Sequence, residues 1–138
     1  MKKIIFILII LTVNNFIFAE QNSKFFNQID EILPAKDVFK ITFTKNNKNL
    51  KINWKIEEGY YLYLNSVDIK INANKRKYRI ISANLYDHED EFFGKTKIIK
   101  NLYKISFKVP QSGTKTKLFY QGCSEKGFCY PVQSINIY

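Results

Sequence analysis

Apolar and polar residues alternate along most of the chain after residue 37, with the two-residue period of a half-buried β-strand. The clearest run is 50–56, where Leu50, Ile52, Trp54 and Ile56 are separated by polar residues. Further strands are predicted at 38–43, 60–64, 67–71, 78–81, 103–109, 118–120 and 134–138. Turn residues separate these runs at intervals of about 8–12 residues, which indicates an all-β sandwich or barrel with one core.

The start of the chain follows a different pattern. Lys2 and Lys3 precede an unbroken apolar run, Ile4 to Leu11, and Ala19 supplies a small residue where a signal peptidase would cut. This layout is typical of a secretory signal peptide. Because Ile17 fits the cleavage pattern poorly, an uncleaved N-terminal anchor is the alternative. The predicted parts are a signal peptide at 1–19, a lead-in at 20–31 and a β-sandwich domain at 32–138.

The chain is basic, with 22 Lys and Arg residues against 12 Asp and Glu and a formal net charge of +10. Lysines alternate with apolar residues, so most of this charge is expected on outward strand faces. Only two arginines are present, whereas Arg is the usual residue for reading bases and clamping phosphates. We therefore predict no nucleic-acid partner. A surface for nucleic acid or anionic lipid is the alternative, with its densest cluster at Lys75, Arg76, Lys77 and Arg79.

Two cysteines in an exported chain predict one disulfide. Five residues separate Cys123 from Cys129, and Gly122 and Gly127 permit a tight return of the backbone. Closing so short a loop would stabilise the fold by only about 2 kcal/mol, against about 4 or more for a bond that spans a domain. The spacing favours a local, exchangeable pair, but by itself leaves a structural bond and a redox pair equally open.

The stretch 87–95 is the most acidic part of the chain and is predicted to be a solvated loop. A metal site with His88 and the carboxylates would lack the second His or Cys that transition metals prefer. We predict no metal ion and no other cofactor. Phe92 and Phe93 before Gly94 are unusual in a solvated loop and are expected to cover another part of the protein.

Tyrosines form the third cluster. In a strand at 60–64, Tyr61 and Tyr63 share one face, and Tyr60 and Leu62 share the other. The chain shows no Ser-His-Asp order, phosphate-binding loop or dinucleotide-binding loop, and its single His leaves few candidates for hydrolytic chemistry.

Together these clusters resemble the N-terminal periplasmic domain of the thiol–disulfide interchange protein DsbD. The matching motifs occur in family order and span nearly all of 32–138. They are Ile32-Leu33-Pro34-Ala35 with Phe39, Trp54-Lys55-Ile56 leading to Gly59-Tyr60-Tyr61-Leu62-Tyr63, His88-Glu89-Asp90-Glu91-Phe92-Phe93-Gly94-Lys95, Tyr120-Gln121-Gly122-Cys123, and Gly127-Phe128-Cys129-Tyr130-Pro131.

The resemblance implies an immunoglobulin-like antiparallel β-sandwich and a role for each matching residue. Cys123 and Cys129 would form the redox pair, with Cys129 entering mixed disulfides. Phe92 would lie in a cap loop over the disulfide and move aside when a partner docks. The residues implied to belong to this cap loop or to flank the site are Asp90, Glu91, Phe92, Phe93, Gly94, Tyr61 and Tyr63.

The resemblance also implies a monomeric, periplasmic protein-disulfide reductase component. Its acceptors would be thioredoxin-fold proteins like DsbC, DsbG or the cytochrome c maturation protein CcmG, and its donor a thioredoxin-like or membrane protein. DsbD continues into a membrane domain and a thioredoxin-like domain, so this chain is expected to be a stand-alone version or a truncated reading frame. The rival interpretation is a non-catalytic immunoglobulin-like binding module with a purely structural disulfide.

Overall fold

A computed structural model describes residues 32–46, 48–91, 93–109 and 114–137. The predicted signal peptide at 1–19 and lead-in at 20–31 lie outside this part of the chain. Within the described residues, no helix is long and apolar enough to cross a membrane. Leu33–Tyr138 forms one compact unit with its own core.

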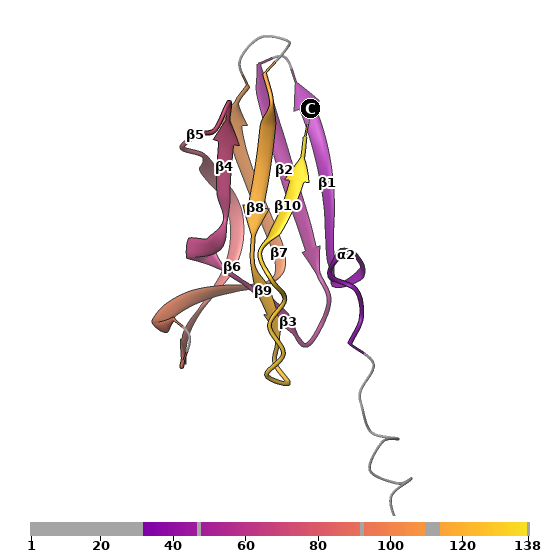
Figure 1. Ribbon diagram of the computed structural model, residues 1–138, viewed down its shortest axis with the longest axis vertical. Helices are drawn as coiled ribbons and strands as arrows, with labels where there is room; N and C mark the ends of the chain where they lie inside the picture. Colours follow the sequence, from indigo (N-terminus) through magenta and orange to yellow (C-terminus); the bar gives the residue numbers. More distant parts are fainter. Residues whose placement is uncertain (1–31, 47, 92, 110–113, 138) are drawn as a thin grey trace, which may run out of the picture. The chain divides into compact units, whose positions relative to one another are not determined.

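Two antiparallel sheets make up this unit (Figure 1). The first sheet has the order β1-β2-β7-β3-β9, with β6 paired to β7, and the second has the order β10-β8-β4-β5. The elements are α2 (Ala35–Val38), β1 (Phe39–Asn46), β2 (Asn49–Ile56), β3 (Tyr60–Tyr63), η3 (Leu64–Ser66), β4 (Asp68–Ile71), β5 (Asn74–Lys75), β6 (Arg79–Asp90), β7 (Gly94–Lys108), β8 (Thr116–Tyr120), β9 (Gly122–Ser124) and β10 (Gln133–Asn136). The predicted immunoglobulin-like antiparallel β-sandwich is confirmed.

The core lies between the sheets and is rich in aromatic side chains. Trp54 of β2 packs against Tyr103 and Tyr120, with ring centroids 5.2 and 6.2 Å apart respectively. Phe39 makes edge-to-face contacts with Tyr120 and Tyr130. Leu50, Ile52, Trp54 and Ile56 are all buried, as the alternation in β2 predicts.

The main difference from the sequence-based expectation is the length of the β6–β7 hairpin. Strands were predicted only at 78–81 and 103–109, with a solvated loop at 87–95. In the structure β6 continues to Asp90 and β7 begins at Gly94. Most of β6 is exposed on both faces, so no alternation of burial marks it in the sequence. Pairing with β7 along almost its whole length forms this strand instead.

Gly122 allows the cysteine-bearing strand β9 to pack closely against the sandwich. A Cβ atom at this position would lie 2.4 Å from Cζ of Phe39 and 2.6 Å from the carbonyl oxygen of Tyr61. Both distances are too short for contact between these atoms, and the second neighbour is backbone that cannot move aside alone. The position of Cys123 therefore depends on the missing side chain of its neighbour.

Gly122→Ala is expected to lower the free energy of unfolding by about 3 kcal/mol, because the added methyl group overpacks the core. Gly59→Ala is the matched control, since Gly59 has a positive φ but open space around it. The control should cost only about 1 kcal/mol of backbone strain. Urea denaturation of both variants measures these costs, and equal costs would contradict the close approach.

Buried tyrosines should make the fold sensitive to alkali. Burial raises the pKa of Tyr120 and that of Tyr130 to about 12, and it raises the pKa of Tyr63 and Tyr103 further. In the unfolded chain these hydroxyls titrate near pH 10. Between about pH 10 and 12 the unfolded state therefore binds fewer protons than the folded state, so stability falls as pH rises.

We expect the free energy of unfolding to fall above about pH 10 by up to about 1.4 kcal/mol per pH unit for each of these tyrosines. Urea denaturation across this range measures the slope, and Tyr120→Phe should make it shallower. Ultraviolet titration showing that all the tyrosines ionise near pH 10 would contradict the expectation.

Candidate redox site

Strand β9 carries Cys123, and the chain turns back after it to bring Cys129 alongside. Cys123 and Cys129 form a disulfide, and their Cα atoms are 4.0 Å apart. The backbone N–H of Ser124 donates to the carbonyl oxygen of Phe128 at 2.7 Å, and that of Tyr130 donates to Gly122 at 3.0 Å. These bonds hold the two sulfurs close together.

The two cysteines differ in their exposure. Cys123 is fully buried, whereas Cys129 is partly exposed. Cys129 also lines a pocket of about 620 Å³, beside residues of β3, β6 and β7. Of the two cysteines, Cys129 is therefore the one open to the surface from this pocket.

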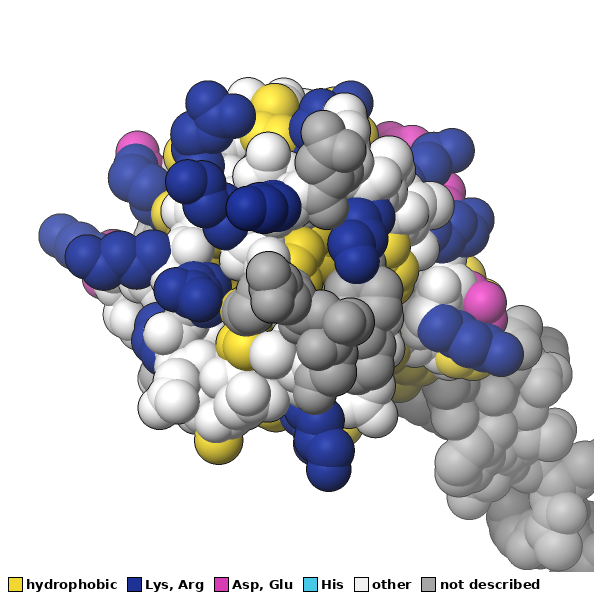
Figure 2. All heavy atoms as spheres, turned by 90° about the horizontal axis from the view of Figure 1, so that it is seen from above, with side chains coloured by type: hydrophobic (Ala, Val, Ile, Leu, Met, Phe, Trp, Pro, Cys, Tyr) yellow, Lys and Arg dark blue, Asp and Glu magenta, His cyan; other side chains and the backbone are white. Residues whose placement is uncertain are grey.

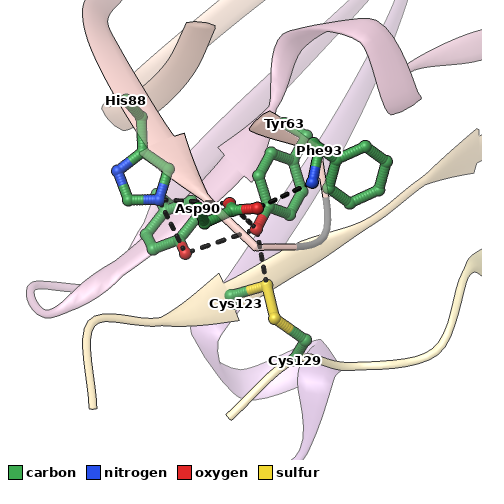
Figure 3. Close-up of polar contacts among 7 residues, drawn as sticks. Tyr63, His88, Asp90, Phe93, Cys123 and Cys129 are labelled. Atoms are coloured by element: carbon green, nitrogen blue, oxygen red, sulfur yellow. Dashed lines mark hydrogen bonds and ion pairs between the residues drawn. A yellow bond between two sulfur atoms is a disulfide. The ribbon is translucent and has the colours of Figure 1, made fainter. Parts of the chain in front are cut away.

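The β3 tyrosines lie directly over the buried sulfur. Tyr61 is paired in register with Cys123, and Tyr61 and Tyr63 share a small buried cluster with this cysteine, on the face of β3 opposite Leu62. Oη of Tyr63 is 3.5 Å from Sγ of Cys123 (Figure 3). Burial, together with a hydrogen bond to Asp90, raises the pKa of Tyr63 well above its ordinary value. Its hydroxyl therefore stays protonated.

Asp90, the last residue of β6, joins the tip of the β6–β7 hairpin to the sandwich. Its Oδ2 accepts a 2.6 Å hydrogen bond from the hydroxyl of Tyr63. Its Oδ1 accepts a 2.8 Å hydrogen bond from the backbone N–H of Phe93. One carboxylate thus bonds both to the strand above Cys123 and to the turn at the hairpin tip. The positive φ of Gly94, where β7 begins, helps to close this turn.

Phe93 lies at the hairpin tip and contacts Tyr63. Its ring packs on that of Tyr63, with the centroids 4.3 Å apart, yet the side chain is 49% exposed. Figure 3 shows the ring beside Tyr63, on the side away from His88. Phe92, for which the family resemblance implies the cap role, lies outside the described residues. Glu91 is exposed and lines the pocket beside Cys129.

His88 is a member of the site that sequence reasoning weighed only as a metal ligand. Its Nε2 lies 3.2 Å from Oδ2 of Asp90 and 3.4 Å from Oη of Tyr61. Its ring also stacks at a tilt on Tyr61, with centroids 5.0 Å apart. Its position two residues before Asp90 on the same strand is the signal that could have placed it on this face. In the described part of the chain, no three His, Cys, Asp or Glu side chains are grouped to hold a metal ion.

An ion pair at the rim of the pocket was also missed. Lys100 of β7 pairs with Glu125 of the cysteine hairpin, and its ammonium lies over the ring of Tyr86, 5.4 Å from the centroid. Lys100 and Glu125 are 25 residues apart in the chain. The pairing of β3 with β7 on one side and with β9 on the other brings Lys100 to this place, and spacing in the sequence does not reveal that strand order.

Replacing Asp90 should expose the disulfide, because both hydrogen bonds that hold the hairpin tip are lost. Hydrogen bonds to a charged group contribute about 1.5–3 kcal/mol each, so a partial loss favours an open tip several-fold. We expect Asp90→Ala to speed reduction of the disulfide by a small thiol about tenfold. The rate is measured with the thiol in excess.

Asp87→Ala is the matched control, since Asp87 is exposed and forms its ion pair with Lys97 of the same hairpin. It should leave the rate nearly unchanged. An equal acceleration by both variants would show that charge, rather than the tether, limits access.

Comparison with known proteins identifies similar sequences and folds. The family described as "Thiol:disulfide interchange protein DsbD, N-terminal" matches residues 30–137. The protein of that name from Citrobacter koseri is 34% identical over 106 residues, covering 75% of this chain. The one from Colwellia psychrerythraea is 36% identical over 120 residues, covering 86%. The matches span only 18% and 20% of these relatives, so the chain corresponds to about a fifth of their length.

Two solved structures from Neisseria meningitidis share the fold. One is the DsbD N-terminal domain in the reduced form, with a TM-score of 0.64, 24% identity, and coverage of 85% of this chain and 93% of that one. The other is a complex between the DsbD N-terminal and PilB N-terminal domains. It has a TM-score of 0.56, 24% identity, and coverage of 79% of this chain and 89% of that one.

Proposed function

Because this chain belongs to the DsbD N-terminal family, we propose that it relays reducing equivalents between thioredoxin-fold proteins through Cys123 and Cys129. The observation that carries the proposal is the unequal burial of the two sulfurs. One is accessible from a pocket and the other lies beneath Tyr63. A bond with no exchange function would need neither the access nor the hydrogen-bonded hairpin tip beside it.

The relay proceeds by two thiol–disulfide exchanges. A thiolate of a reduced donor attacks Sγ of Cys129, the Cys123–Cys129 bond breaks, and Cys123 leaves with the electron pair and takes up a proton. The donor's second thiolate then attacks the mixed disulfide, and Cys129 is released. The donor is oxidised to a disulfide and the domain is reduced to a dithiol by two electrons. The reverse steps reduce an acceptor.

Tyr63 is positioned to stabilise the reduced form. Its hydroxyl hydrogen is donated to Asp90, which leaves the oxygen free to accept from the S–H of Cys123 at the 3.5 Å separation seen here. The buried thiol therefore has an acceptor once the disulfide opens. With Asp90 and Glu91 nearby, the surroundings favour the neutral thiol over the thiolate. The reduced domain is then a poor nucleophile until a partner displaces the hairpin tip.

We also propose the cap role for the hairpin tip, with Phe92 and Phe93 as its apolar side chains. The contact between Phe93 and Tyr63 supports this role, and that of Phe92 rests on its motif. The proposed acceptors are proteins like DsbC, DsbG or CcmG, the donor is a thioredoxin-like or membrane protein, and the compartment is the periplasm. A similar domain, that of Neisseria meningitidis DsbD, forms a complex with a PilB domain.

Trapping a mixed disulfide tests the proposal. Cys123→Ala leaves Cys129 as the single thiol, and Cys129→Ala leaves only the buried Cys123. Each variant is mixed with a thioredoxin-fold protein that retains one cysteine, activated as its thionitrobenzoate disulfide. Cys123→Ala should form the covalent adduct at least about tenfold faster, because only Cys129 is accessible.

Release of thionitrobenzoate gives the rate, and non-reducing gels identify the adduct. Circular dichroism confirms that both variants are folded, with Cys123→Ser as a replacement if the alanine variant is not. No adduct from a folded variant, or equal rates from both, would support the structural-disulfide interpretation instead.

A further inference from the structure

Lysine and arginine side chains gather at the end of the sandwich opposite the disulfide. This end is formed by the β1–β2 turn, the β4–β5 turn, the last residues of β7 and the first of β8 (Figure 1). Figure 2 looks down on it and shows Lys and Arg side chains around its rim. Its exposed cations, called the basic end below, are Lys45, Lys48, Lys51, Lys75, Arg76, Lys77, Arg79, Lys108, Lys115 and Lys117.

Carboxylates are concentrated elsewhere. Asp68 is a carboxylate near the basic end, where it forms an ion pair with Lys75 at 3.3 Å. The other described carboxylates lie in α2, in the β2–β3 turn, in the β6–β7 hairpin near its tip and in the cysteine hairpin: Asp37, Glu57, Glu58, Asp87, Glu89, Asp90, Glu91 and Glu125. If the lysines served only to keep the protein in solution, cations and carboxylates would be expected to be mixed over the whole surface.

A groove at the basic end brings four cations together. Lys51, Lys77, Arg79 and Lys108 line it with Asn49 and Ser106, around a volume of about 440 Å³, and no carboxylate takes part. Ser106 of β7 pairs in register with Lys51 on one side and with Arg79 on the other. Residues paired in this way project from the same face of the sheet, so a hydroxyl lies between two cations.

The second sheet repeats the pattern at the same end. Lys70 of β4 is paired in register with Lys117 of β8 on one side and with Lys75 of β5 on the other. Like charges directly opposite one another destabilise a sheet. The ion pair of Lys75 with Asp68 relieves part of this repulsion, and an anionic surface lying against the row would relieve the rest, whereas water with dilute salt only screens it.

We propose that the basic end binds the phosphate headgroups of an anionic phospholipid membrane. The cations surround one end of the sandwich (Figure 2), so a broad, flat, negative surface laid across this end meets side chains from both sheets and from the turns between their strands. Lysines near such a surface each strengthen binding several-fold. The proposal is separate from the exchange chemistry, because the groove and the disulfide lie at opposite ends of the sandwich.

Single-stranded nucleic acid fits this surface less well. Its binding sites combine cations with exposed aromatic rings on which bases stack. In the groove, Phe107 is buried, and the hydroxyl of Tyr78 donates to the carbonyl oxygen of Val67. Membrane contact at the basic end would direct Cys129 away from the bilayer, toward proteins in solution.

Vesicle co-sedimentation tests the proposal. Residues 33–138 are used, because this unit contains the core and every described strand, and because it excludes the apolar run at Ile4 to Leu11. The probes are vesicles of phosphatidylcholine alone or mixed with phosphatidylglycerol. The test variant is Lys51→Gln/Lys77→Gln/Arg79→Gln/Lys108→Gln. The control variant, Lys36→Gln/Lys40→Gln/Lys55→Gln/Lys97→Gln, removes the same charge away from the groove.

The unit should bind the phosphatidylglycerol vesicles and not the neutral ones, with an affinity that falls as salt rises. The test variant should bind at least about tenfold more weakly, and the control within about twofold of the parent. Equal losses in both variants, or no binding at low salt, would overturn the proposal. So would tighter binding to an RNA oligonucleotide than to vesicles at the same salt, or release from the vesicles by millimolar inorganic phosphate.

Discussion

The carboxylate of Asp90 makes the contact on which the rest of the site depends. It accepts one hydrogen bond from Tyr63, over the buried sulfur of Cys123, and another from the backbone of Phe93, at the tip of the hairpin. The base of the β6–β7 hairpin is fixed because β7 pairs with β3, which in turn pairs with β9, and the Asp90 link fixes the hairpin tip beside Tyr63. We propose that this link controls access to the S–S bond, because a docking protein can replace the hydrogen bonds of Asp90.

Strands with one buried face were predicted well from the sequence. β2 has polar and apolar residues in strict alternation, and β4 and the last part of β7 follow the same rule. Their two-residue period arises because alternate side chains face the core and the solvent. The long β6 has no such record, because Ile80, Ile81, Leu85 and Tyr86 are all exposed. β6 is a strand because it pairs with β7, and the register of such pairing cannot be read from a single sequence.

The part of the site that follows from strand periodicity and local spacing was also predicted, and the part that depends on strand pairing was not. The shared face of Tyr61 and Tyr63 follows from the two-residue period of a strand, and the short spacing of the cysteines indicates a local bond. The involvement of His88 and the pairing of Lys100 with Glu125 depend on how the hairpin folds back over β3 and β9. Those contacts join residues far apart in the chain, so composition and spacing do not reveal them. Resemblance to a family placed Asp90 at the site, but not the two hydrogen bonds by which it joins the hairpin tip to Tyr63.

The central claim is that the Cys123–Cys129 bond is exchangeable. Its reduction potential tests this most directly, measured by equilibrating the folded domain with a thioredoxin-fold protein of known potential and quantifying both redox forms. A relay between thioredoxin-fold proteins should have a potential between about −270 and −120 mV. A potential below about −300 mV, typical of structural disulfides, would contradict the claim.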